Sequence, residues 1–309
     1  MIRRNVAERM SFMALPLVTA VCLIAVCQAQ DPAGQGPIRE PVYRVNKTVA
    51  HEETETSTPQ TQEHPLAPAV RVASEGLESI RANVQDYTCT LVKREEVEGV
   101  LLDPEYIFMK VRHENRDADG NKIHPFSVYM YFVKPDKRRG REVMYIEGEN
   151  DGRLIAHEGS GVISKFTAAL EPESKMAMED NRYPITNIGI ENLIIRLLEV
   201  AERDMQYGEC EVDFFDGAKI NGRVAKCIQV VHPVPRKNFR FHIARIFIDK
   251  EANVPIRFAS YDWPKEKGGK PVLQEEYTYL NMKLNVGLTD DDFSLDNPNY
   301  KFTKPVLKM

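Results

Sequence analysis

The residue types that carry most enzyme chemistry are scattered along this sequence. The histidines of the C-terminal three quarters lie far apart, at His113, His124, His157, His232 and His242. The HExxH, paired CxxC, GxSxG and GxxxxGK[ST] patterns, which mark metal sites, serine nucleophiles and phosphate loops, do not occur. We therefore expect no catalytic residue, no metal site and no cofactor, and we interpret the protein as a non-enzyme.

One segment has the alternating oxygen side chains of a calcium loop. Asp117, Asp119 and Asn121 alternate, but Gly120 comes too early, and the twelfth position, where a calcium loop carries a bidentate glutamate, is Val128. A turn between strands is the better interpretation.

The cysteines allow one bridge. Cys22 and Cys27 fall in the apolar N-terminal segment, which leaves Cys89, Cys210 and Cys227. Cys210 and Cys227 flank a predicted hairpin, so a disulfide across it is one alternative and two thiols are the other. Cys89 alternates with apolar neighbours, which indicates a small core residue rather than a nucleophile.

The densest charge feature lies between two predicted strands and contains Lys137, Arg138, Arg139 and Arg141. Such a run is usually a solvated loop. Contact with anionic head groups or another anionic partner is the alternative.

The N-terminus has the layout of a secretory leader. Arg3, Arg4 and Arg9 precede an uncharged apolar run that ends at Cys27, and cleavage is expected after Ala29. An acylated Cys27 or Cys22 and an uncleaved anchor are the alternatives. We expect a signal peptide at 1–29 and an exported, periplasmic or envelope-associated protein.

The rest of the chain divides by composition. Residues 30–71 are rich in Pro, Gln, Thr and Glu and predict a disordered linker. Residues 72–309 are expected to form one domain. The net charge of −5 and the lack of a long basic stretch argue against a nucleic-acid partner.

Strands dominate the predicted domain. Alternation predicts strands at 87–95, 105–113 and 127–134, and a hairpin around 148–152. Four more strands follow at 223–232, 239–249, 255–262 and 272–284. Helical spacing predicts helices at 73–84, capped by Ser74, and at 190–205, capped by Thr186 or Asn187 and stopped by Gly208. The short connections predict antiparallel pairing in a curved α+β sheet of about nine to eleven strands with helices on one face.

Several segments, among them YTCTLVKREEVEG, GREVMYIEGENDGRLIAHEG and YPITNIGIENLIIRLLEVAERD, resemble an uncharacterised family of exported bacterial proteins, a domain of unknown function. The pattern Asn285, Gly287, Leu288, Phe293 is similar to the lipoprotein-carrier superfamily of LolA and LolB type. That second resemblance implies a half-open barrel whose concave face is covered by helices and encloses a cavity for acyl chains.

The alternating strand residues could line such a cavity: Ile107, Met109, Val111, Val128, Met130 and Phe132. A filled core of the same residues is the alternative. We expect a binding protein for a lipid or a lipoprotein acyl chain that also meets a membrane surface or an envelope protein. A protein-interaction or envelope-sensing module is the second hypothesis, and a hydrolase whose residues converge only in the fold is the third.

Overall fold

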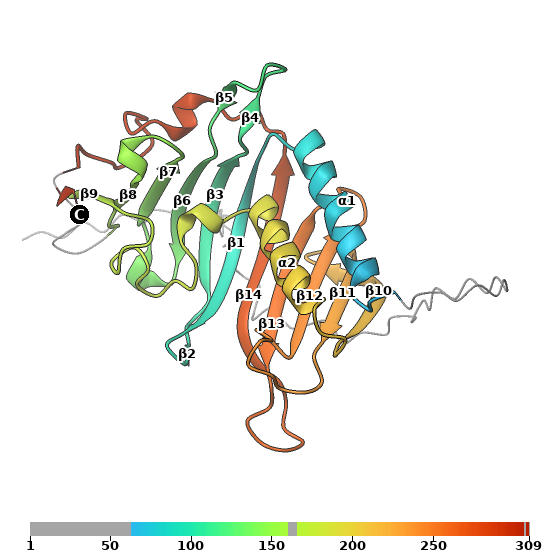
Figure 1. The fold of residues 1–309 in the computed structure, drawn as a ribbon. Helices are drawn as coiled ribbons and strands as arrows, with labels where there is room; N and C mark the ends of the chain where they lie inside the picture. Colours follow the sequence, from blue (N-terminus) through green and yellow to red (C-terminus); the bar gives the residue numbers. More distant parts are fainter. Residues whose placement is uncertain (1–62, 160–165, 306, 309) are drawn as a thin grey trace, which may run out of the picture. The chain divides into compact units, whose positions relative to one another are not determined.

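The computed structural model describes residues 63–159, 166–305 and 307–308. The predicted leader and residues 30–62 of the predicted linker lie outside them. Within the described residues, 13 strands form one sheet and two further strands form a small hairpin (Figure 1).

The strands of the large sheet are β1 (Asp86–Val97), β2 (Val100–Leu101), β3 (Glu105–Arg112), β6 (Ser127–Lys134), β7 (Glu142–Ile146), β8 (Leu154–His157), β9 (Thr167–Leu170), β10 (Glu211–Ile220), β11 (Arg223–Val231), β12 (Ile243–Asp249), β13 (Pro255–Asp262), β14 (Val272–Leu284) and β15 (Leu307–Lys308). The small hairpin is β4 (Asn115–Arg116) and β5 (Lys122–His124). The helices are α1 (Ala67–Asn83), α2 (Ile190–Asp204) and the 3-10 turns η1 (Asp136–Arg138), η2 (Asn150–Gly152), η4 (Ile185–Asn187) and η5 (Asp290–Phe293).

The order of the sheet is β10-β11-β12-β13-β14-β1-β3-β6-β7-β8-β9-β15, with β2 paired to β1. Neighbours are antiparallel except β15 and β9. The predicted fold class is confirmed: the sheet is a curved antiparallel one that stays open between β10 and β15, with helices on its concave face. It has more strands than predicted because two-residue strands such as β2 and β15 are too short to show alternation.

Both long helices lie on the same face of the sheet (Figure 1). Arg81 of α1 forms an ion pair with Glu191 of α2 at 2.7 Å. α1 begins at Ala67, so the predictions of a start at 73, a Ser74 cap and a linker reaching 71 are wrong. Pro68 stands in the first turn, where its missing N–H and fixed φ are tolerated.

The cap predicted for α2 is also wrong. Gly189 precedes the helix with a φ of 107°, and no side chain caps it. Instead, the backbone N–H of Ile190 donates to the buried hydroxyl of Tyr87 at 3.1 Å. The helix ends at Asp204, before the predicted stop at Gly208. A strand residue thus takes the place of the local cap, which is a contact that sequence spacing does not show.

The sheet face opposite the helices has its own apolar cluster. Tyr129, Met144 and Ile146 are buried there against Phe293 and Tyr300 of the C-terminal segment. The rings of Tyr129 and Tyr300 stack with centroids 4.0 Å apart. The C-terminal segment therefore covers the back of β6 and β7.

Asp86 joins the first strand to the end of β14. Its carboxylate is 5% exposed and accepts backbone N–H groups from Val286 at 2.7 Å, Gly287 at 3.2 Å and Leu288 at 3.1 Å. Asn285, which precedes them, accepts the N–H of Gln85 at 2.8 Å. The Asn285, Gly287, Leu288 pattern noted in the sequence is therefore the turn that this carboxylate holds.

Candidate functional site

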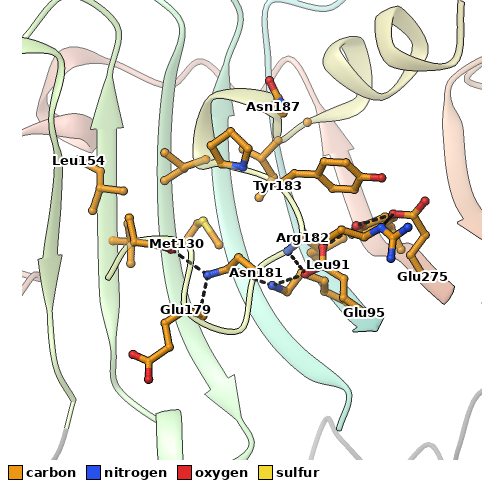
Figure 2. Close-up of a pocket in the computed structure, with 18 of the residues that line it drawn as sticks. Leu91, Glu95, Met130, Leu154, Glu179, Asn181, Arg182, Tyr183, Asn187 and Glu275 are labelled. Atoms are coloured by element: carbon orange, nitrogen blue, oxygen red, sulfur yellow. Dashed lines mark hydrogen bonds and ion pairs between the residues drawn. The ribbon is translucent and has the colours of Figure 1, made fainter. Parts of the chain in front are cut away.

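A cavity of about 410 Å³ lies between the sheet and the chain that follows β9. Its floor comes from β1, β6, β7, β8, β9, β13 and β14, and its cover from residues 176–189 and α2. Pockets of this size hold drug-sized ligands. Figure 2 shows Leu154 and Met130 toward one end and Arg182, Glu95 and Glu275 toward the other.

Strand register explains why the cavity is there. One row of directly paired residues crosses six strands from β1 to β9, and all its side chains share one face: Cys89, Met109, Met130, Val143, Ala156 and Ala168. From Met109 to Ala168 the side chains of this row shorten, from methionine to valine to alanine. The last four line the cavity. The small residues of β8 and β9 leave unfilled space under the covering segment.

The cover is apolar where it faces this row. Pro184, Ile185 and Ile188 of the segment before α2, and Leu193 and Leu197 of α2, line the cavity. The 3-10 turn η4 follows Pro184 directly, and α2 begins at Ile190. Most of the wall that a ligand meets is therefore hydrocarbon, although the cavity has one polar end.

The polar end is a buried network centred on Lys93. This residue is 7% exposed and lies 3.3 Å from Glu95 and 3.2 Å from Glu105. Its ammonium group donates to the Asn181 side chain at 2.6 Å. Arg138, also buried, forms an ion pair with Glu105 at 3.0 Å. The network ties the covering segment to β1 and β3.

Two carboxylates face each other across β1 and β14 in the same network. Glu95 and Glu275 are directly paired and buried. The hydroxyl of Tyr277 donates to Glu95 and lies 3.2 Å from Glu275. Glu95 also accepts the backbone N–H of Arg182 at 3.0 Å, and Glu275 accepts the Ser260 hydroxyl at 3.0 Å. Burial among these charges raises the pKa of Tyr277 well above its ordinary value.

A second cavity of about 90 Å³ lies between α1, α2 and strands β11 to β13. It shares Leu197, Val200, Phe241 and Phe258 with the first cavity, so these residues divide the two. Asp204 lines it at the end of α2, and its carboxylate is 3.4 Å from the ring of buried His232. Burial raises the pKa of Asp204 to about 6 and lowers the pKa of His232.

The predicted ligand-binding residues separate into two groups. Met130 and Phe132 line the first cavity. The other four, Ile107, Met109, Val111 and Val128, are fully buried in the core beneath it. Whether any of the six contacts a ligand stays a prediction.

The predicted basic run does not act as one surface. Arg138 is buried in the Lys93 network. Arg141 lines the cavity and forms an ion pair with Glu158 at 2.8 Å. Lys137 and Arg139 are exposed, and Arg139 pairs with Asp136 at 2.6 Å. An anionic partner for the run stays a prediction, which now concerns only the exposed members.

The disulfide alternative is wrong within the described residues, where no bond joins Cys210 and Cys227. Cys227 pairs across the hairpin with Phe215, and Cys210 precedes Glu211, the first residue of β10. The sulfur atoms therefore stand several residues apart along the strands. Cys89 is buried, and burial raises the pKa of its thiol far above the ordinary value, which keeps the thiol protonated.

The described residues contain no cluster of three or more metal-ligating side chains. Among the residues placed by the structure, no helix has both the length and the hydropathy to cross a membrane.

Sequence reasoning missed the part of the cavity that lies beyond β6. Val143, Ala156 and Ala168 alternate with outward residues in their strands, and that alternation was a signal for their face. Alternation does not, however, give the strand register that aligns these three residues in one row. Arg182 and Tyr183 of the cover gave no periodic signal at all.

Residues 84–302 match the family described as "Protein of unknown function (DUF1571)". The chain belongs to this family. The predicted resemblance to a domain of unknown function is thereby confirmed. A search of curated proteins finds no match to the chain.

Solved structures with a similar chain trace include a lipoprotein, LppX, from Mycobacterium tuberculosis, which is 12% identical with a TM-score of 0.39; the match covers 72% of this chain and 98% of that one. A DUF1329 family protein from Desulfovibrio piger is 14% identical with a TM-score of 0.33, covering 75% and 98%. A LolA superfamily protein from Nitrosomonas europaea is 10% identical with a TM-score of 0.30, covering 73% and 97%. At these scores, function has to be argued from the chain's own residues.

Proposed function

We propose that this protein is a non-enzymatic binding protein that holds the hydrocarbon chain of a lipid, or of an acylated protein, in the 410 Å³ cavity. The observation that supports the proposal is the unfilled row of small apolar residues under an apolar cover. Burying a methylene group contributes about 0.8 kcal/mol, so ten methylenes contribute about 8 kcal/mol before ordering costs. The predicted leader supports an extracytoplasmic location, periplasmic or in the cell envelope.

The polar end argues for a structural rather than a catalytic role. Glu95 and Glu275 are both occupied by internal donors, namely Tyr277, Ser260 and the Arg182 backbone. Carboxylates that act as acid or base must reach a substrate proton. These two instead hold the cover on the sheet.

Exposed apolar residues mark the mouth of the cavity. Met176 is 53% exposed and Phe166 is 48% exposed, and both line it. Apolar groups at a rim reduce the cost of moving a hydrocarbon chain from a membrane or a partner into the cavity. A membrane surface or an envelope protein is therefore the source that we propose for the ligand.

The test is native mass spectrometry with lipid extraction on the purified protein. We expect a bound lipid in the wild type and none in Met130→Asp, which places a carboxylate on the cavity floor. Met178→Asp is the control, because Met178 is half-buried in the covering segment but does not line the cavity.

A second variant is needed because Met130→Asp could lose its lipid simply by failing to fold. Ala156→Phe reduces the cavity without adding charge, and circular dichroism checks that it is folded. A wild-type protein that carries no lipid and takes up no fluorescent fatty acid would refute the proposal, as would a folded Ala156→Phe variant that carries as much lipid as the wild type.

A further inference from the structure

Three guanidinium groups surround Tyr183 at the rim of the cavity. Arg196 of α2 lies over its ring at 5.1 Å from the centroid. Burial and the charge of Glu275 raise the pKa of the Tyr183 hydroxyl, whereas hydrogen bonding by Arg182 and the charge of Arg240 act in the opposite direction. Tyr183, Arg182, Arg196 and Arg240 all line the cavity. Positive charge from the covering segment, α2 and the β11–β12 connection thus lines the same cavity as this ring.

The carboxylates nearby do not neutralise this rim completely. Arg182 lies 3.5 Å from Glu275, but its buried Nε donates no hydrogen bond. Arg196 reaches Glu199 only at 3.8 Å, and Glu199 is 55% exposed. Such a distant, exposed pair leaves the guanidinium available.

Arg240 has the fewest polar contacts of the three arginines. It is exposed, and within the described part of the chain it forms no hydrogen bond and no ion pair. Burial raises the pKa of the Asp204 carboxyl and the charge of Arg240 acts in the opposite direction, but the two residues form no ion pair among the described residues. An exposed cation beside an apolar cavity is placed to meet a charged group at the end of a bound chain.

We propose that the ligand carries an anionic head group, a carboxylate or a phosphate, which Arg196 and Arg240 bind at the rim while its hydrocarbon chain fills the cavity. This inference rests on the proposed function and adds the charge of the ligand to it. Arginine presents a planar fork of donors that suits both oxyanions. The ring of Tyr183 lies beneath the Arg196 guanidinium and attracts it by a cation–π interaction.

The experiment compares three ligands with the same chain. Lauric acid, dodecyl phosphate and dodecanol, each below its micellar concentration, compete with the neutral fluorophore Nile red on the purified protein. We expect the two anionic ligands to displace the fluorophore at about tenfold lower concentration than dodecanol, because each guanidinium contact is partly exposed. In the Arg196→Gln/Arg240→Gln double variant the difference should close, while displacement by dodecanol stays unchanged.

Arg203→Gln is the matched control, because Arg203 carries the same charge on an exposed turn of α2 and does not line the cavity. It should keep the preference. Equal displacement by all three ligands overturns the head-group inference and leaves the binding function standing. A protein that binds neither Nile red nor any of the three overturns the proposed function itself. The relative strength of acid and phosphate identifies which oxyanion the rim selects.

Discussion

Two neighbouring alanines of β9 give the sharpest test of the cavity. Ala168 faces the cavity and lines it, whereas Ala169 points to the opposite side of the sheet and is 3% exposed there. The same replacement by leucine at the two positions should change stability in opposite directions. One adds carbon to empty space, and the other adds it to a filled core.

The magnitude follows from the added atoms. Leucine has three more carbons than alanine, and burying them contributes about 2 kcal/mol. Fixing the leucine rotamer costs about 0.5–1 kcal/mol. Ala168→Leu should therefore raise the free energy of unfolding by about 1–2 kcal/mol. Ala169→Leu should lower it by about 1–3 kcal/mol, as overpacking does.

Equilibrium unfolding in urea measures both variants. For an unchanged slope, Ala168→Leu should move the midpoint upward by about 0.5 M. The same variant should bind less lipid, because the leucine occupies ligand space. If Ala168→Leu destabilises the protein as much as Ala169→Leu does, the space above β9 is filled, and the reasoning from the shortening row of side chains is wrong.

Three further predictions concern the polar groups. Lys93→Met removes the ammonium group beside buried Glu95 and Glu105, although Arg138 still pairs with Glu105, and should cost about 3 kcal/mol in urea unfolding. Lys122→Met, which removes exposed ion pairs, should cost less than about 1 kcal/mol; equal costs would show that the buried ion pairs of Lys93 do not stabilise the fold. Asp86→Ala removes the acceptor of three backbone N–H groups and should lower the free energy of unfolding by about 2–4 kcal/mol. Hydrogen exchange at residues 286–288 should become faster; unchanged exchange there would show that the Asp86 carboxylate does not hold this turn. Burial raises the pKa of Asp204 to about 6, so its contribution to stability is complete below about pH 4 and is lost as the pH rises through about 6. Asp204→Asn should therefore be more stable than the wild type at about pH 7.5, on the order of 1–2 kcal/mol, with the difference vanishing toward about pH 4; a difference that does not depend on pH would show that Asp204 titrates normally.

Strands with clear alternation could be predicted from the sequence to the residue. β6, β13 and β14 have the predicted bounds, and the meander from β10 to β14 follows from the short connections between its strands. This works because alternation and turn residues are local properties of the chain. The helix ends were less accurate, since α2 begins where Tyr87, a residue distant in sequence, accepts the first free N–H.

The candidate site was predicted only in its central part. Met130 and Phe132 line the cavity because they share a face with the rest of their strand. Ile107 and Met109 have the same pattern, yet the chain above them fills that space. Which half of a sheet stays open depends on register and on the path of the covering segment, and neither is a local property.

The shortening row also has a consequence for how this family can diversify. The core under α1 and α2 and the row on β7 to β9 belong to different halves of one sheet. Val143, Ala156 and Ala168 lie at the cavity end of the same apolar cluster, so substitutions there change the volume of the cavity more than the packing under α1 and α2. On the proposed function, single substitutions in this row would adapt relatives to longer, shorter or branched chains, and a designer could do the same on this scaffold.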